Sequence, residues 1–199
     1  MNYLLEKAKI LRNLKFLTST VNDRLISSFD NLEDEAEKKA TQIIEEGGPD
    51  NEDGSLEYEA AYVREAHLRI NNALKQELKN IVSVWLFHLF EKNCHQIFQK
   101  TKEREVNAHL KSLEIDTTKN SKCWKINCEL RLVANSIKHG QGPAYNELKK
   151  LRPDLFNDQT SFISQVNISI SSDDLDTYTS VINDFWVEYF DKAIKSNNT

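Results

Sequence analysis

The spacing of apolar residues predicts helices along most of the chain. Leu4, Ala8, Leu11 and Leu14 recur at intervals of three and four residues, the period of one face of an α-helix. The same pattern predicts helices over residues 3–29, 31–46 and 56 to about 102, and residues 101–115 are expected to form a polar helix or the frayed end of one. The third is much longer than an average globular helix and is expected to form the centre of the molecule, either unbroken or bent once.

The last third of the chain predicts shorter elements. We expect Ser121 to cap a helix that ends before Gly140, and a short helix over 144–151 to end before Pro153. Residues 166–170 alternate between apolar and polar and are β-branched, which indicates an extended strand. Ser172 or Asp173 is expected to cap a final helix. The fold class predicted is all-α, a bundle of about five to seven helices with one short β or extended segment near 165–171.

The composition favours one domain, residues 1–199. Only 5 Gly and 3 Pro argue against an all-β fold, which needs many turns. A Gly- and Asp-rich stretch predicts a flexible acidic loop at about 47–56. No stretch approaches the roughly 18 apolar residues of a membrane span. The longest apolar stretch, 81–90, contains His88 and predicts a core helix.

Several features favour a cytoplasmic protein without a cofactor. The N-terminus mixes charged residues with leucine and lacks the apolar stretch of a signal peptide. The three cysteines, Cys94, Cys123 and Cys128, have no disulfide-framework spacing, which fits a reducing compartment. Cys123 and Cys128 lack a second pair, so no structural zinc site is expected. The chain contains no sequence motif that indicates a cofactor.

Charge is unevenly distributed. The segment from Asp30 to Glu59 has twelve acidic and two basic residues, a net charge of −10, whereas Lys119 to Arg152 has eight basic and two acidic residues, a net charge of +6. A local basic patch can bind a polyanion even in an acidic protein. The alternative is that the two segments pair with each other inside the molecule.

The segment Glu129–Gly140 has the most informative pattern. In a helix, Arg131, Asn135 and His139 lie on one line because each is four residues from the next. Gly140 is a helix-terminating residue, so His139 is expected in the last turn. An arginine, an amide and an imidazole in a row can bind a phosphate and transfer a proton.

A helical wheel separates two faces of this segment. Its core-facing stripe consists of Leu130, Val133, Ala134 and Ile137. Beside it lies a stripe of Trp124, Cys128, Arg131, Asn135, Lys138 and His139, residue types that fit a partly buried cleft or an interface rather than a solvated face. The alternative is structural: Arg131 and Asn135 hydrogen-bond neighbouring helices, and His139 caps carbonyl groups.

Three polar residues of the long helix have a spacing that could form a metal-binding stripe. His88, Glu91 and His95 lie at i, i+3 and i+7 of the long helix. A di-metal bundle uses Glu-x-x-His and a second set of ligands, whereas the order here is His-x-x-Glu and no second copy occurs. We therefore expect solvent-facing or hydrogen-bonded polar residues here, and no metal site.

At Arg131 and His139 the chain resembles the HEPN superfamily, helical-bundle proteins of prokaryotic defence and toxin–antitoxin systems with an arginine and a histidine on one helix. Seven residues separate the two here, one more than the longest usual family spacing, and Leu132 stands where a polar residue is usual. The run Ala134-Asn135-x-x-Lys138-His139-Gly140, followed by a short helix and Arg-Pro-Asp-Leu-Phe at 152–156, is similar to that of uncharacterised bacterial helical proteins.

The resemblance implies metal-independent RNA cleavage at a site assembled across a homodimer. His139 would act as general base or acid on a ribose 2′-hydroxyl, Arg131 would stabilise the charge that builds on the phosphorane, and Asn135 would orient the imidazole or a phosphate oxygen. Lys122, Lys125 and Lys138 would add affinity for RNA. The rival hypothesis is a non-catalytic interaction module, an antitoxin, immunity or adaptor protein, whose acidic segment 30–59 binds a basic partner.

Overall fold

The expected all-α class is confirmed by the computed structural model, which describes residues 2–47, 54–99, 103–156 and 167–197. The α-helices are α1 (Tyr3–Thr20), α2 (Leu32–Glu46), α3 (Ser55–Phe98), α4 (Glu103–Ser112), α5 (Lys122–Trp124), α6 (Arg131–His139), α7 (Pro143–Leu151) and α8 (Ser172–Asn197). Residues 48–53 of the predicted acidic loop and residues 165–166 of the predicted extended segment lie outside the described residues.

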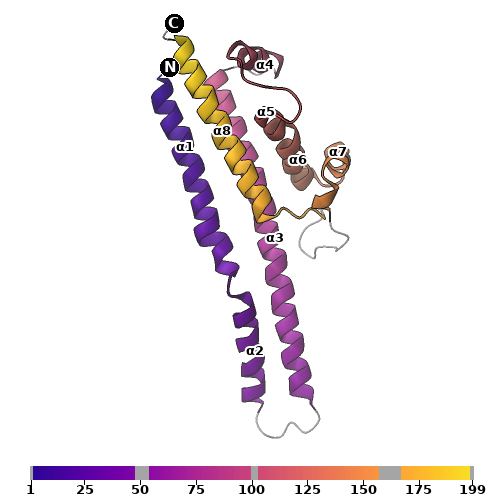
Figure 1. Cartoon of the computed structure of the whole chain (residues 1–199). Coiled ribbons are helices and arrows are strands. Elements are labelled where there is room, and N and C mark those ends of the chain that lie inside the picture. The colour runs from indigo at the N-terminus through magenta and orange to yellow at the C-terminus, as the bar shows by residue number, and fades with distance from the viewer. Residues whose placement is uncertain (1, 48–53, 100–102, 157–166, 198–199) are drawn as a thin grey trace.

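The 44-residue helix α3 runs unbroken along the whole molecule (Figure 1). At 1.5 Å per residue it is about 66 Å long. Helices α1 and α8 lie beside its C-terminal half, and the segment from α4 to α7 lies on the other side of α8 and α3. The N-terminal half of α3 projects beyond this bundle with α2 alongside, and we call this projecting pair of helices the arm.

The first predicted helix is interrupted near its end. Instead of continuing to Phe29, the chain forms a π-helical turn at Val21–Ile26 and a 3-10 turn at Ser27–Phe29 before α2 begins. A π-helix bonds residue i to i+5, so it rotates the chain relative to a regular helix. These turns carry the chain from α1, which packs in the main bundle, to α2 in the arm.

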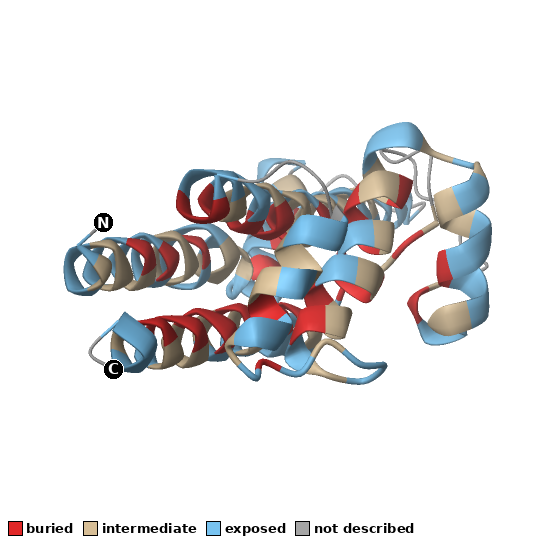
Figure 2. Cartoon of the chain, turned by 90° about the horizontal axis from the view of Figure 1, so that it is seen from above, coloured by how far each residue is buried: buried red, intermediate tan, exposed pale blue. Residues whose placement is uncertain are grey.

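An aromatic core joins α8 to α3. Phe185, Trp186, Tyr189 and Phe190 of α8 are all at most 1% exposed. Phe90 of α3 contacts both Phe185 and Trp186, with ring centroids 5.2 and 5.7 Å apart. In the view from above, the buried faces of the helices turn toward one another (Figure 2). Aromatic burial of this kind contributes most of the energy of a small core.

The arm is packed differently. Its buried residues are Leu32, Ala36 and Ala40 of α2 and Ala60 of α3, and none belongs to the main core cluster. Small alanine side chains allow two helices to approach closely but bury little apolar area. The arm is therefore held by much less apolar burial than the bundle.

The extended segment is present, but within the described residues it forms no strand. Residues 167–171 have one isolated bridge, between Ile168 and Phe156. Their carbonyl groups are bonded by side chains of α3 instead: Asn80 Nδ2 donates to Ile168 O at 2.9 Å and Gln76 Nε2 donates to Ile170 O at 3.0 Å. The alternation predicted a strand, whereas these residues bond mainly to side chains of α3, with one backbone bond from the Ser169 N–H to Leu155 O at 2.8 Å.

The predicted cap of the last helix is wrong by one residue. Ser171, rather than Ser172 or Asp173, caps α8: the Asp174 N–H donates to Ser171 Oγ at 3.0 Å, and the Ser171 N–H donates to Asp174 Oδ2 at 3.0 Å. This reciprocal arrangement is a capping box. By contrast, the predicted Ser121 cap is confirmed, since its hydroxyl accepts from the Trp124 N–H at 3.2 Å.

Candidate functional site

Arg131, Asn135 and His139 lie on the outer edge of α6. Arg131 and His139 are exposed and Asn135 is half-buried. In the described part of the chain, no hydrogen bond or ion pair holds any of the three side chains. The structural alternative, in which these residues bond neighbouring helices or cap carbonyls, is therefore wrong. Their side chains remain available to a ligand.

The opposite face of α6 is buried as the wheel predicts. Leu130, Val133 and Ala134 are fully buried, and Ile137 is half-buried. The helix ends at His139, and Gly140 adopts a φ of 71°, a left-handed value that favours glycine. His139 thus lies in the last turn, as expected, and its side chain is exposed.

The wheel fails for residues before Arg131. A π-helical turn spans Lys125–Leu130, so a constant step of 100° per residue no longer applies there. Trp124 and Cys128 line a cavity together with Arg131, whereas Asn135 and His139 lie outside that cavity. The predicted single polar stripe is therefore divided into a cavity-lining part and a solvent-facing part.

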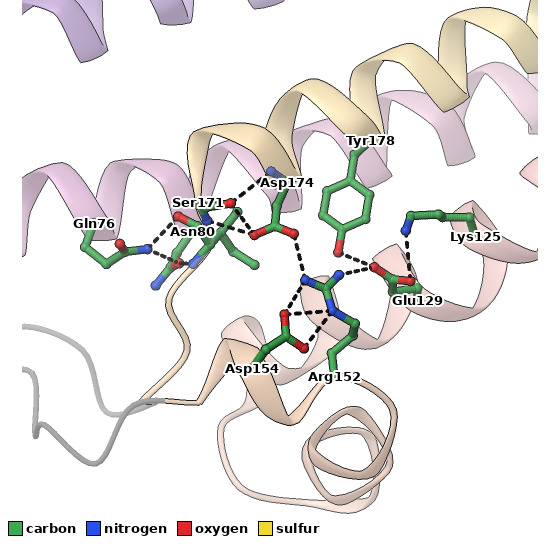
Figure 3. Close-up of polar contacts among 10 residues, drawn as sticks. Gln76, Asn80, Lys125, Glu129, Arg152, Asp154, Ser171, Asp174 and Tyr178 are labelled. Carbon is green, nitrogen blue, oxygen red and sulfur yellow. Dashed lines mark hydrogen bonds and ion pairs between the residues drawn. The ribbon is translucent and has the colours of Figure 1, made fainter.

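The turn at 125–130 also buries Glu129, whose carboxylate is the centre of an ionic network (Figure 3). The Glu129 side chain is only 5% exposed. It accepts hydrogen bonds from Arg152 Nη1 at 2.5 Å and from the Tyr178 hydroxyl at 2.9 Å. Lys125 Nζ lies 3.3 Å from its second oxygen. The network joins the π-helical turn before α6 to the chain after α7 and to α8.

Arg152 is shared among three carboxylates. It also donates to Asp154 Oδ2 at 2.7 Å and to Asp174 Oδ1 at 2.8 Å. Such multiple charge-assisted bonds use the planar fork of the guanidinium group. Arg152 and Asp154 belong to the Arg-Pro-Asp-Leu-Phe sequence. In this fold that sequence therefore anchors the segment after α7 to the π-helical turn before α6.

The network shifts the pKa values of its members. The hydrogen bond from Arg152 lowers the pKa of Asp154. Burial alone would raise the pKa of Asp174, but hydrogen bonds from Arg152 and Ser171 outweigh it and leave that pKa lowered. Burial, with the charge of Glu129, raises the pKa of Tyr178. Each shift favours the protonation state found in the network at neutral pH, which indicates a structural role.

This network was missed by the sequence analysis. A signal was available, because the wheel places Glu129 only about 40° beyond the end of the core stripe. An acidic residue there requires a buried partner, and the arginine before Pro153 is a candidate. The pairing could not be derived, since Arg152 lies 23 positions after Glu129.

Two of the three predicted RNA-binding lysines form ion pairs within the chain. Lys122 Nζ lies 2.8 Å from Glu188 Oε2, and Lys125 pairs with Glu129. Lys138 is exposed and makes no such pair among the described residues. Partly exposed pairs such as Lys122–Glu188 are weak and can exchange one anion for another, so Lys138 is the most available of the three.

The basic and acidic segments do not neutralise each other in the described part of the chain. The basic residues of 119–152 that form ion pairs contact Glu129, Asp154, Asp174 and Glu188. Asp30, Glu35 and Glu37 of the acidic segment instead pair with residues of α3. Among the described residues, the two segments therefore do not pair with each other.

The described residues contain no group of three or more His, Cys, Asp or Glu side chains that could hold a metal ion. His88 and Glu91 are in contact, with Nδ1 and Oε2 3.4 Å apart. His95 instead lines the cavity with Arg131.

Comparison with protein-family models, with curated proteins and with solved structures gives no match to this chain. None of the described helices is both long and apolar enough to cross a membrane.

Proposed function

We propose that this chain is a HEPN-like RNA-binding protein of a prokaryotic defence or toxin–antitoxin system, which cleaves RNA without a metal. The observation that carries the proposal is the outer edge of α6, where Arg131, Asn135 and His139 are held by no other part of the described chain. Three unengaged polar side chains with phosphate-binding and proton-transfer chemistry are not needed for the fold, which makes a ligand the simplest reason for them.

The spacing of the three residues favours a site made by two copies. His139 is eight positions after Arg131, about 12 Å along the helix axis. Side chains on a helix lean toward its N-terminus. Because both side chains lean the same way, the distance between them stays close to the distance between their positions on the helix. One phosphodiester group cannot contact both from a single helix. A second copy can place its His139 beside the Arg131 of the first.

In this arrangement each residue has a defined task. His139 removes the proton from a ribose 2′-hydroxyl or donates one to the leaving oxygen. Arg131 stabilises the negative charge that develops on the phosphate oxygens. Asn135 lies between them and orients the phosphate. Lys138 adds attraction for the RNA backbone, which weakens as salt increases.

An RNA cleavage assay with excess chelator tests the proposal. Wild-type protein is expected to cleave, and His139→Ala to lose activity by at least about 100-fold, the typical contribution of general acid–base catalysis. Arg131→Ala is expected to lose activity similarly. The matched controls are Gln141→Ala, an exposed polar residue beyond the helix end, and Arg12→Ala, an exposed arginine on α1. Equal cleavage by His139→Ala, or none by wild type, contradicts the proposal.

The arm favours the second candidate, a non-catalytic interaction module. Its helix α2 presents Glu33, Asp34 and Glu45 to solvent, on a projection that Figure 1 shows standing apart from the bundle. A charged, projecting helix is suited to a basic protein partner. Titration with a lysine-rich peptide tests this function: binding should weaken in the triple variant Glu33→Gln, Asp34→Gln, Glu45→Gln.

A further inference from the structure

A cavity of about 270 Å³ lies beside α6. It is lined by the C-terminal half of α3, by α4, by the turn from α5 to α6, and by Phe185 of α8. Its volume is slightly below the roughly 300–1,000 Å³ typical of pockets for drug-sized ligands. A single ring system fits such a space better than a larger molecule does.

The floor of the cavity is aromatic. Phe87, Phe98 and Phe185 line it and are at most 7% exposed, so their rings are fixed by the core. Trp124 forms part of the wall and is half-buried. Flat, apolar surfaces of this kind bind a planar ring by stacking and by exclusion of water.

The rim is polar and positively charged at one point. Asn107 comes from α4 and Asn127 from the π-turn, and both side chains line the cavity near solvent. Amide groups donate and accept at once, as recognition of base edges requires. Arg131, exposed and without a partner among the described residues, contributes a guanidinium group. Glu91 contributes one carboxylate, which can accept from an exocyclic amino group and is already in contact with His88.

We propose that this cavity binds a single unstacked nucleobase of RNA while Arg131 holds the adjoining phosphate. The inference rests on the proposed function and specifies how the same helix edge takes its substrate. Sequence-tolerant recognition of single-stranded RNA uses unstacked bases on aromatic side chains with phosphates on basic ones. Here Arg131 belongs to both the cavity and the outer edge of α6. A base in the cavity therefore leads the next nucleotides along α6 toward Asn135 and His139.

Binding of a five-nucleotide adenosine RNA to the full chain tests the inference, with chelator present. A second RNA lacks only the central base. We expect the abasic RNA to bind about tenfold more weakly, the loss typical of one stacked base. Equal affinity for the two RNAs would overturn the proposal, because the phosphates alone would then account for binding.

A variant that fills the cavity gives an independent measurement. Asn107→Trp places a large ring at the rim, and the matched control is Asn146→Trp on the exposed surface of α7. We expect Asn107→Trp to bind both RNAs with the affinity of the abasic RNA, and Asn146→Trp to behave as wild type. If Asn107→Trp does not fold, as judged by circular dichroism, Asn107→Phe, with a smaller ring at the same position, replaces it. A folded variant that still prefers the intact RNA tenfold overturns the cavity as the site.

These outcomes separate the inference from the proposed function. Discrimination between the two RNAs without any cleavage supports the base site and contradicts the nuclease. Cleavage by wild type with equal affinity for the two RNAs supports the nuclease and contradicts the base site.

Discussion

At the scale of single residues, one short segment contains both a buried charged group that holds the fold and an exposed charged group that is available to a ligand. Glu129 is buried and holds Arg152 and Tyr178, whereas Arg131, two positions later, is exposed without a partner among the described residues. The two were expected to share a helix with a regular wheel. The π-helical turn at Lys125–Leu130 instead buries Glu129 and leaves Arg131 exposed. Substitution of Glu129 should therefore change stability, and substitution of Arg131 should change activity.

The first prediction concerns Glu129. Glu129→Gln removes the buried charge that accepts from Arg152 and Tyr178. Since a hydrogen bond to a charged group contributes about 1.5–3 kcal/mol, we expect a loss of about 2–3 kcal/mol in the free energy of unfolding, measured with urea. Glu147→Gln, an exposed carboxylate on α7, is the control and should change stability by less than about 0.5 kcal/mol. Equal effects would mean that the network contributes little.

The second prediction concerns acid. The folded-state pKa values of Asp154 and Asp174 are lowered, so each contributes stability that is present above the unfolded value of about 3.9 and is lost as the pH falls through the folded value. Urea unfolding at about pH 7 and about pH 3 should show a loss in wild type. Asp174→Asn should be less stable at neutral pH and lose less on acidification. A parallel loss in both proteins would contradict this assignment.

At the scale of elements, helix ends and helix pairs depend on a few local contacts. Ser171 and Asp174 form the capping box of α8, although the sequence pattern favoured Ser172 or Asp173. In the arm, α2 packs on α3 through three alanines and Leu32, outside the main core cluster. Each observation predicts a measurable difference within one element.

Ser171→Ala should destabilise the protein by about 1 kcal/mol, because it leaves an N–H group of the first turn of α8 without its acceptor. Ser172→Ala, at the neighbouring exposed position, should have an effect within about 0.5 kcal/mol. Thermal or urea unfolding of the two variants measures the difference. If Ser172→Ala proves the more damaging, the cap lies where the sequence pattern placed it.

The arm should open more readily than the bundle. Amide hydrogen exchange reports local opening, which is easiest where few apolar contacts are buried. We expect faster exchange in α2 and in the first half of α3 than in residues 80–98 of the same helix. Uniform protection along all of α3 would show that the arm is as stable as the core.

At the scale of the whole molecule, the proposed cleavage site depends on two copies. If Arg131 of one copy acts with His139 of the other, Arg131→Ala and His139→Ala are each inactive alone. Mixing them under conditions that exchange subunits forms hybrids in which one site has both residues. We expect cleavage to reappear in the mixture, measured with the assay above. A mixture that stays inactive, while sedimentation shows hybrids, contradicts a shared site.

The helical class, the length of α3 and the buried face of α6 could be predicted because apolar periodicity is a local property. The position of Arg131 and His139 away from the buried face followed from the same periodicity, whereas their residue types had favoured a partly buried cleft or an interface. The network around Glu129 could not be predicted, since its partners come from distant segments. The aromatic cavity could not be predicted either, because Asn107 and Phe185 come close to α6 only through long-range packing.

The sequence by itself determined which residues face inward on each helix, where most helices begin and end, and that positive charge surrounds α6 while negative charge lies in segment 30–59. Only the tertiary structure decided that Glu129 is buried, that Arg131 borders a cavity, and that Asn80 bonds the extended segment. Periodicity acts within one helix, whereas a buried charge or a cavity depends on which helices meet. That choice depends on packing of the whole chain, which no local pattern contains.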